Sequence, residues 1–204
     1  MKRSPVSARI LTVCSGNICR SPLAEALLRR ELSGLDVVVE SAGTIAADGA
    51  QMPDEAQRLA ENLRVSPAEA AAHRSRYLDT STLDGASLVL AMSREHRRRV
   101  VELDPRRLRS TFTAREFARL ATNADDALVR DAARAAGPAP ERRVTAVIET
   151  VVAQRGIAPL PLAPDDDDII DPYRRSWETY KLSGAQLVPA VEQIARVLRT
   201  GLTA

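Results

Sequence analysis

The sequence predicts an α/β fold built on a mainly parallel, four-stranded sheet with helices on both faces. Two observations lead to this prediction. Short apolar runs alternate with helical patterns along the first half of the chain, and a tight polar loop directly follows the first apolar run. Strands that alternate with helices pair in parallel, because a helix is the usual connection between parallel strands. Ligands bind to such sheets beyond the carboxyl ends of the strands, which is where we expect this loop.

Each element of the predicted sheet and its helices has a local signal. The predicted strands are short apolar runs, of which the last is the weakest, at 10–13, 35–39, 87–92 and 108–112. The predicted helices carry apolar residues at helical spacing and lie at 22–31, 55–63 and 93–103. At the start of the first helix, Ser21 is a suitable N-cap and Pro22 a suitable first residue. These signals place the polar loop between the first strand and the first helix.

The second half of the chain predicts helices. Helical patterns cover 121–136 and 142–154, with a Gly-Pro-Ala-Pro linker between them. The second pattern has an apolar stripe at positions i, i+3, i+4, i+7 and i+8, which is typical of core packing, with a partner site as the alternative. A last helix is predicted over 176–198, broken or bent near Gly184 and Pro189.

Composition favours one domain. A chain of 204 residues that is 45% hydrophobic can bury a sizeable core, so we expect a single domain over 1–204 with a helical extension at 121–164. No run approaches the roughly 18 apolar residues of a membrane span, so we expect a cytoplasmic protein without membrane insertion. The two cysteines form no four-ligand zinc set, and we expect neither a metal nor a cofactor. The dominance of arginine over lysine suggests a bacterial genome of high GC content.

The loop between Cys14 and Arg20 combines a nucleophile with a phosphate-binding site. Backbone N–H groups around a helix N-terminus can converge on one phosphoryl group, and Gly16 allows the left-handed or close-approach conformation that this requires. Arg20 can add two parallel hydrogen bonds. Helix N-termini and cations favour thiolates, so Cys14 is the candidate nucleophile, with a small buried cysteine as the alternative. We assign phosphate and substrate binding to the loop residues Ser15, Gly16, Asn17, Ile18 and Cys19.

Asp171 is the candidate general acid. The leaving oxygen of a poorly activated phosphoester departs well only when it is protonated, and the same carboxylate can later act as a base. Pro172 restricts Asp171 to an extended conformation. The aspartates at 165–168 lie just upstream, and we expect their charge to favour the protonated form of Asp171. The alternative is an ordinary Asp-Pro turn in an acidic, solvated loop.

The segment CSGNICRSP at 14–22 resembles the signature of the low-molecular-weight protein-tyrosine phosphatases. The resemblance continues in the segments 41–44, 73–76 and 171–173. It implies a hydrolase that forms a phosphocysteine on Cys14, with Asp171 protonating the leaving oxygen and then activating water. Residues 121–164 are covered poorly, because family members usually have a shorter connection there.

The resemblance also implies a set of supporting residues. Asn17, Ser21, Ser41 and His73 match family positions that hold the phosphate loop in shape through hydrogen bonds. Ser21 is also expected to donate its hydroxyl to the thiolate. His73 taken alone is compatible with an ordinary surface or core histidine. His96, beside a run of arginines, is predicted to lie on an exposed helix face, and we assign it no function.

Two residues indicate an aromatic phosphoester as the substrate. Tyr173 matches a family position that lines the slot for a phosphotyrosine ring, and Ile18 is expected to touch the same ring. The segment 44–52 has no aromatic residue where many relatives carry a tryptophan, and Ala47 or a neighbour stands there. Arginine phosphatases of this family tend to have a small polar residue in place of Ile18. We therefore expect phosphotyrosine hydrolysis, with a protein-arginine phosphatase as the alternative.

Cys19 has two competing interpretations. Its proximity to Cys14 would allow it to trap an oxidised nucleophile as a disulfide and so protect it from irreversible oxidation. The other interpretation is a small side chain that packs against the first helix.

Two functions from other classes stay open as alternatives. A phosphate-binding regulatory module with little turnover would keep the loop, but binding alone does not need Asp171. DNA binding rests only on arginine clusters at 96–99 and 106–109, and a net charge of +2 with few aromatics favours solvated helix faces instead. The expected partner is a phosphorylated protein, with a bacterial tyrosine kinase as a candidate, and no nucleic acid.

Overall fold

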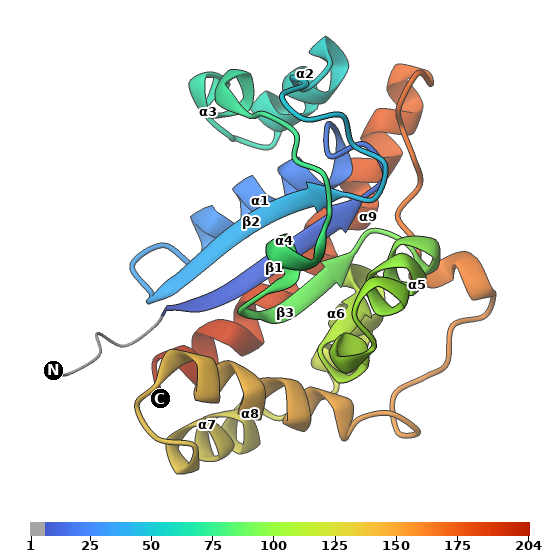
Figure 1. The fold of residues 1–204 in the computed structure, drawn as a ribbon. Helices are drawn as coiled ribbons and strands as arrows, with labels where there is room; N and C mark the ends of the chain where they lie inside the picture. Colours follow the sequence, from blue (N-terminus) through green and yellow to red (C-terminus); the bar gives the residue numbers. More distant parts are fainter. Residues whose placement is uncertain (1–6) are drawn as a thin grey trace, which may run out of the picture.

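The computed structural model describes residues 7–204 and has a four-stranded, fully parallel sheet at its centre (Figure 1). The strand order is β2-β1-β3-β4, with the strands at Ala8–Cys14 (β1), Val37–Gly43 (β2), Ala86–Ala91 (β3) and Thr111–Thr113 (β4). β1 is mostly apolar and almost fully buried because it lies between two neighbours. The predicted parallel α/β fold is confirmed.

The strand order places the loop after β1 at a switch in connectivity. The chain leaves β1 for β2 on one side and later crosses to β3 on the other side. Cys14 pairs with Gly43 and Val13 with Ala91, so the carboxyl ends of these strands meet at one edge of the sheet. Connections that diverge at such a point leave a crevice, which is the usual ligand site of open α/β sheets.

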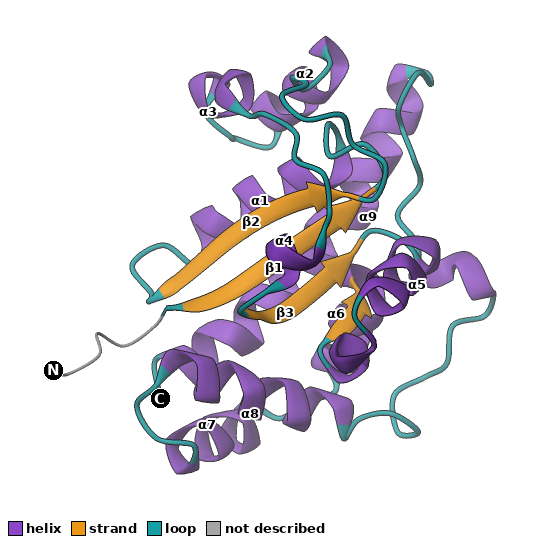
Figure 2. Cartoon of the chain, in the orientation of Figure 1, coloured by secondary structure: helices purple, strands orange, loops and turns teal. Residues whose placement is uncertain are grey.

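Helices cover both faces of the sheet, as predicted (Figure 2). They are α1 (Arg20–Glu31), α2 (Asp54–Asn62), α3 (Pro67–Ala72), α4 (Thr80–Leu83), α5 (Arg94–Leu103), α6 (Ala114–Thr122), α7 (Asp126–Ala135), α8 (Pro140–Val152), α9 (Trp177–Leu202) and the short 3-10 helices η1 (Pro105–Arg109) and η2 (Pro164–Asp167). The larger core joins Ile10 and Phe112 of the sheet to α1, α6, α8 and α9. A smaller core joins Leu11 to Leu83 of α4 and Val100 of α5 on the other face.

Two strands differ from their predicted bounds. β2 starts two residues after its predicted start and runs on to Gly43, because Ser41 continues the parallel ladder opposite Thr12. The second half of β2 contains the polar residues Glu40 and Ser41, so it lacks the apolar run from which the strand was predicted. The predicted strand at 108–112 is largely replaced by η1, because Asp104 accepts the Arg106 N–H and starts a 3-10 turn, and β4 has only three residues.

The C-terminal helices also differ from their predicted bounds. The single helix predicted at 121–136 is interrupted, because Asp125 caps a new helix by accepting the Ala127 N–H at 2.6 Å. α9 is one continuous helix, so it is not broken near Gly184 and Pro189, and the predicted alternative of a bend there stays a prediction. Burial around Pro189 offsets a local cost of about 3 kcal/mol. Neither α9 nor another helix within residues 7–204 combines the length and apolar character that a membrane crossing requires.

Helices α7 and α8 lie within residues 121–164, where a helical extension is predicted. They lie near the starts of β1 and β3 and away from the loop that follows β1 (Figure 1). The apolar stripe of α8 faces the core, with Val144, Val147 and Val151 fully buried, as its spacing predicts. A Cβ on Gly201 of α9 would lie 2.3 Å from Cγ2 of Val147, so α8 and α9 are in direct backbone-to-side-chain contact.

Candidate active site

The loop after β1 buries the Cys14 thiol at the N-terminus of α1. Cys14 is 2% exposed, and its Sγ lies 3.0 Å from the Ser21 hydroxyl. The helix begins at Arg20 with Cys19 as a cap residue that makes no side-chain cap bond, so the predicted N-cap role of Ser21 is wrong. Ser21 instead lies inside the first turn, where its hydroxyl is directed at Cys14. Ser21 Oγ accepts from Asn17 Nδ2 at 2.9 Å, and its own proton has two acceptors within reach, the Cys14 sulfur at 3.0 Å and the Ala42 carbonyl at 3.4 Å.

Asn17 holds the loop in shape. Its φ of 52° lies in the left-handed region, which asparagine tolerates better than most residues, whereas Gly16 does not adopt a positive φ. The Asn17 amide also donates to Ser41 Oγ at 2.7 Å, and its Oδ1 accepts the Arg76 N–H at 2.8 Å. His73 Nε2 donates to the Asn17 carbonyl at 2.7 Å. The structure thus brings Ser41 and His73 to the loop where the sequence placed them.

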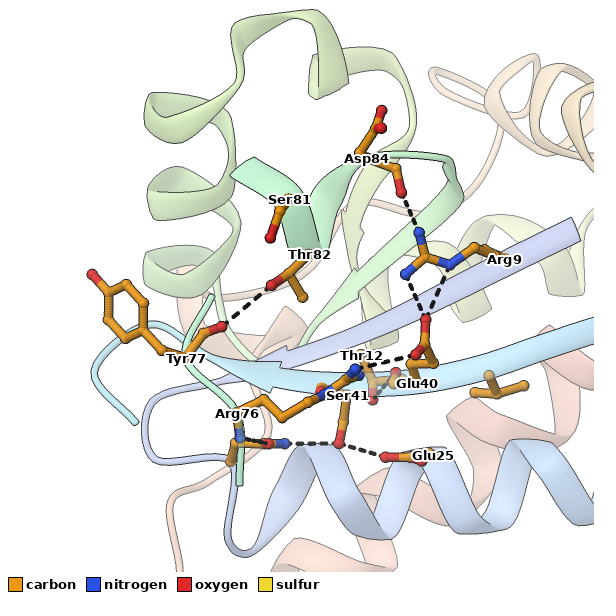
Figure 3. A network of polar contacts seen from close by, with 12 residues as sticks. Arg9, Thr12, Glu25, Glu40, Ser41, Arg76, Tyr77, Ser81, Thr82 and Asp84 are labelled. Atoms are coloured by element: carbon orange, nitrogen blue, oxygen red, sulfur yellow. Dashed lines mark hydrogen bonds and ion pairs between the residues drawn. The ribbon is translucent and has the colours of Figure 1, made fainter. Parts of the chain in front are cut away.

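Glu25 and Arg76 extend this network, and sequence analysis did not assign them a role. Ser41 Oγ donates to Glu25 Oε2 at 2.5 Å, and the Arg76 guanidinium donates to the Ser41 carbonyl at 2.9 Å and to Glu40 at 3.1 Å (Figure 3). Burial alone would raise the pKa of Glu40, but its contacts with Arg9 and Arg76 hold that pKa below its usual value. The charged Glu40 on β2 therefore holds the guanidinium groups of Arg9 and Arg76 beside this strand. Glu25 follows Ser21 by one helical turn, which is the only sequence signal for it.

Gly43 allows β2 to approach the loop closely. A Cβ at Gly43 would lie 2.4 Å from the Ser15 carbonyl oxygen and 2.8 Å from the Asn17 backbone nitrogen. No side chain fits there without moving the loop. The Ile45 N–H then donates to the same Ser15 carbonyl at 3.0 Å, which ties the segment after β2 to the loop. Ile45 itself is apolar and 73% exposed, and it lies in the segment 44–52, which has no aromatic residue.

Arg20 and Asp171 lie together although they are far apart in the sequence. Arg20 is buried, its Nη1 donates to the Ile169 carbonyl at 3.0 Å, and its Nη2 lies 2.7 Å from Asp171 Oδ2. Asp171 is half-exposed on the loop before α9. Two of the upstream aspartates have their own partners, since Asp167 binds Arg119 at 2.8 Å and Asp168 accepts a backbone N–H from α5. These two residues anchor the loop in this structure.

Tyr173 and Ile18 provide apolar surface at the site. Tyr173 is 41% exposed and follows Asp171, whose Oδ1 accepts the Tyr173 N–H at 3.2 Å. The Arg174 guanidinium lies 5.1 Å from the centroid of the Tyr173 ring, within the range of a cation–π contact. Ile18 is partly buried against the larger core.

Cys19 is buried beneath the loop as a free thiol. Its Sγ lies 4.0 Å from the Tyr180 hydroxyl of α9. Burial, with a contribution from the Cys14 charge, raises the pKa of Cys19 to about 12. It therefore stays protonated near neutral pH and is a buried, packed side chain as one of the two interpretations predicts, although its printed contact is with α9 and not with the first helix. Its capture of oxidised Cys14 stays a prediction.

His96 lies against the phosphate loop, so its predicted place on an exposed helix face is wrong. It is 4% exposed, and its Nε2 lies 2.7 Å from Ser15 Oγ while its Nδ1 lies 2.8 Å from Ser93 Oγ. Burial, followed by the charge of Arg20, lowers the pKa of His96 to about 3. The spacing of His96 and Val100 by four residues, both on the buried face of α5, was the available signal.

Comparison with known proteins assigns the chain to a family. Residues 9–155 match the family described as low molecular weight phosphotyrosine protein phosphatase, and the chain belongs to this family. Members of the family are cysteine-dependent protein phosphatases, and this protein is an enzyme of that class.

The names of individual relatives refer to two different substrates, phosphoarginine and phosphotyrosine. A protein-arginine-phosphatase of Geobacillus stearothermophilus is 41% identical over 110 residues, which cover 53% of this chain and 70% of the relative. The low molecular weight protein-tyrosine-phosphatase Etp of Escherichia coli is 40% identical over 96 residues, which cover 47% of this chain and 62% of the relative. The solved YwlE arginine phosphatase from G. stearothermophilus has a TM-score of 0.65 at 29% identity and covers 95% of this chain and 94% of its own.

Proposed function

We propose that this enzyme hydrolyses phosphotyrosine in proteins through a phosphocysteine on Cys14, with Arg20 binding the phosphoryl group and Asp171 acting as general acid and base. One observation carries the proposal. The buried Cys14 sulfur lies 3.0 Å from the Ser21 hydroxyl at an α-helix N-terminus, and Arg20 at the end of the same loop lies 2.7 Å from Asp171. A nucleophile, an oxygen-binding cradle and a proton donor therefore share one site.

The first chemical step transfers the phosphoryl group to sulfur. The Cys14 thiolate supplies the electron pair of the new S–P bond, and the P–O bond to the tyrosine oxygen breaks. The loop amides and Arg20 hold the equatorial oxygens, on which charge is redistributed. Phosphate oxygens compete with Asp171 for the Arg20 guanidinium, and their negative charge favours the protonated carboxyl. Asp171 then gives its proton to the leaving phenolate.

The second step releases phosphate by hydrolysis. Asp171, now a carboxylate, takes a proton from water as the water oxygen attacks phosphorus. The S–P bond breaks, and the electron pair returns to the Cys14 sulfur. The Ser21 hydroxyl donates to this thiolate and makes it a better leaving group.

Ile18 and Tyr173 are the basis for proposing phosphotyrosine. An apolar loop side chain and a half-exposed ring beside the acid suit a flat phenyl group, and each such contact contributes about 0.5–1.5 kcal/mol. Phosphoarginine is the second candidate, because a relative 41% identical to this chain is named a protein-arginine-phosphatase. Its guanidinium is polar and gains less from an apolar slot.

We propose a phosphorylated bacterial protein, such as a tyrosine kinase, as the partner. The support is that relatives from Ralstonia solanacearum and E. coli are named protein-tyrosine-phosphatases. A cytoplasmic location agrees with this proposal, because both cysteines are free and a reducing compartment keeps thiols from forming disulfides.

A comparison of three phosphopeptides tests the substrate proposal. We expect kcat/KM to be highest for phosphotyrosine, lower for phosphoarginine and lowest for phosphoserine when the flanking sequence is the same. Ile18→Thr replaces the apolar contact by a small polar side chain and should shift the preference toward phosphoarginine. Equal or higher kcat/KM for phosphoarginine in the unmodified enzyme would replace the substrate assignment and leave the cysteine chemistry intact.

A further inference from the structure

Ser15 and His96 form a side-chain contact between the phosphate loop and α5. The Ser15 hydroxyl lies 2.7 Å from His96 Nε2, and the other ring nitrogen lies 2.8 Å from the Ser93 hydroxyl. Ser93 is the N-cap of α5, and its Oγ also accepts the His96 N–H. The imidazole ring is thus fixed from the helix side and directed at the residue that follows Cys14.

Ser15 is held on two sides. Its carbonyl accepts the Ile45 N–H at 3.0 Å and lies against Gly43, where a Cβ would come within 2.4 Å. Its hydroxyl contacts His96. The Ser15 backbone N–H is the loop amide next to the nucleophile, so its direction depends on both attachments.

The turn between β3 and α5 also contacts the loop that carries Asp171. The Met92 carbonyl accepts the Ile169 N–H at 2.9 Å, and Asp168 Oδ1 accepts the Arg94 N–H at 2.7 Å. The segment 92–96 therefore touches both the phosphate loop and the acid loop. A displacement of this turn would move the amide beside the nucleophile and the acid together.

His96 suits this place because its ring is neutral. Burial and the nearby Arg20 charge keep its pKa far below neutral, so one ring nitrogen donates and the other accepts. A serine hydroxyl can donate to one ring nitrogen or accept from the other. Both serine contacts can therefore form while the imidazole is neutral, so that His96 adds no positive charge beside the phosphate loop.

We propose that His96 is a positioning residue, which holds the Ser15 hydroxyl so that the amide beside Cys14 stays directed at the phosphoryl oxygens. The inference rests on the proposed function, because it concerns the transition state of that reaction. His96 touches no substrate and acts only through Ser15.

A double-mutant cycle tests the inference. His96→Leu leaves the Ser15 hydroxyl without its partner, and we expect about a tenfold loss of kcat/KM, mainly in kcat. His96→Gln, whose amide reaches the position of Nε2, should recover most of that loss. In a Ser15→Ala background, His96→Leu and His96→Gln should have equal activity, because the contact is already absent.

Controls separate positioning from stability. The Thr113 hydroxyl caps α6 by accepting the Glu116 N–H at 3.0 Å. Thr113→Ala removes this cap and should lower the melting temperature without lowering kcat. If His96→Leu does not fold, His96→Asn replaces it, because its shorter amide retains the Ser93 side but does not reach Ser15.

The outcomes distinguish this inference from the function on which it rests. Additive effects of the Ser15 and His96 substitutions, or full activity of a folded His96→Leu, would overturn the positioning role. An unmodified enzyme without phosphatase activity, or an active Cys14→Ser variant, would overturn the proposed function instead. Recovery by His96→Gln only where Ser15 is present supports the inference.

Discussion

Asp171 and Arg20 differ in burial although they touch each other. Arg20 is 6% exposed and the Asp171 side chain is 51% exposed, so the carboxylate proposed as the general acid faces solvent. The buried guanidinium stays fixed by its bond to the Ile169 carbonyl. A bound phosphoryl group can therefore displace the carboxylate without moving the cradle.

This arrangement predicts how Asp171→Asn behaves. The amide cannot give a proton to the leaving group, so aryl phosphates with poor leaving groups should be cleaved about 10²–10⁴-fold more slowly, and activated esters much less so. Single-turnover kinetics across a leaving-group series measures the difference. Asp165→Asn, an exposed aspartate on the same loop, is the matched control and should keep the activity of the unmodified enzyme. Equal slowing across the series would assign the acid to another residue.

The neutral state of His96 predicts a dependence of stability on acid pH. Its pKa is about 3 in the folded state and 6.5 when unperturbed, so below pH 6.5 the unfolded state binds more protons. This part of the stability is complete above pH 6.5 and falls by about 1.4 kcal/mol per unit as pH drops toward 3. Denaturant unfolding at several pH values should show a shallower acid dependence for His96→Gln. The same slope in both proteins would contradict a buried neutral His96.

Residues that act within one local motif could be predicted from the sequence. Cys14, Asn17 and Arg20 lie within seven positions, and their chemistry follows from a strand, a loop and a helix start. The contact between Ser15 and His96 joins residues 81 positions apart, and an arginine run beside His96 resembled a solvated surface. Only the packing of α5 on the sheet turns that histidine inward.

At the level of elements, the end of β2 controls the shape of the phosphate loop. We expect Gly43→Ala to force the loop away, because the added Cβ would overlap the Ser15 carbonyl and the Asn17 nitrogen. The kcat/KM for p-nitrophenyl phosphate should fall by about 10²-fold or more, as a displacement of about 1 Å can cause.

Gly34→Ala is the matched control for Gly43→Ala. Gly34 has a φ of 81° with no atom near the position of a Cβ, so alanine there is strained by about 1 kcal/mol but touches nothing. It should lower stability and leave kcat/KM unchanged. A Gly43→Ala variant with full activity would contradict the close contact between β2 and the loop.

Element types were more predictable than element bounds. The start of α1 lies at Arg20 because the phosphate loop itself turns the chain into the helix, which made the usual Ser-Pro start signal misleading. α9 continues through Pro189 because buried neighbours on both sides stabilise it. In both cases tertiary contacts outweighed a local preference that the sequence displays.

At the level of the whole molecule, α7 and α8 lie away from the active site and add to its core. Val147→Ala should lower the free energy of unfolding by about 1–3 kcal/mol, because it leaves a cavity beside α9, and should leave kcat/KM unchanged. Leu128→Ala, on the exposed face of α7, should change stability by less than about 0.5 kcal/mol.

Denaturant unfolding, followed by two spectroscopic signals, also tests the expected single domain. Far-ultraviolet circular dichroism follows all helices, whereas the fluorescence of Trp177 reports on α9 near the phosphate loop. One shared transition in denaturant is expected if the helical extension and the catalytic half unfold together. Two separate transitions would show that α7 and α8 form an independent unit.

The proposed reaction passes through a covalent phosphocysteine on Cys14, and rapid-quench mass spectrometry can detect this intermediate. The enzyme is mixed with a phosphotyrosine peptide, quenched within one turnover and digested, and the phosphorylated fragment is sequenced. We expect the phosphate on the Cys14 sulfur, accumulating further in Asp171→Asn with an activated ester because the base for hydrolysis is missing. Phosphate on another residue, or turnover by Cys14→Ser at the rate of the unmodified enzyme, would contradict the account.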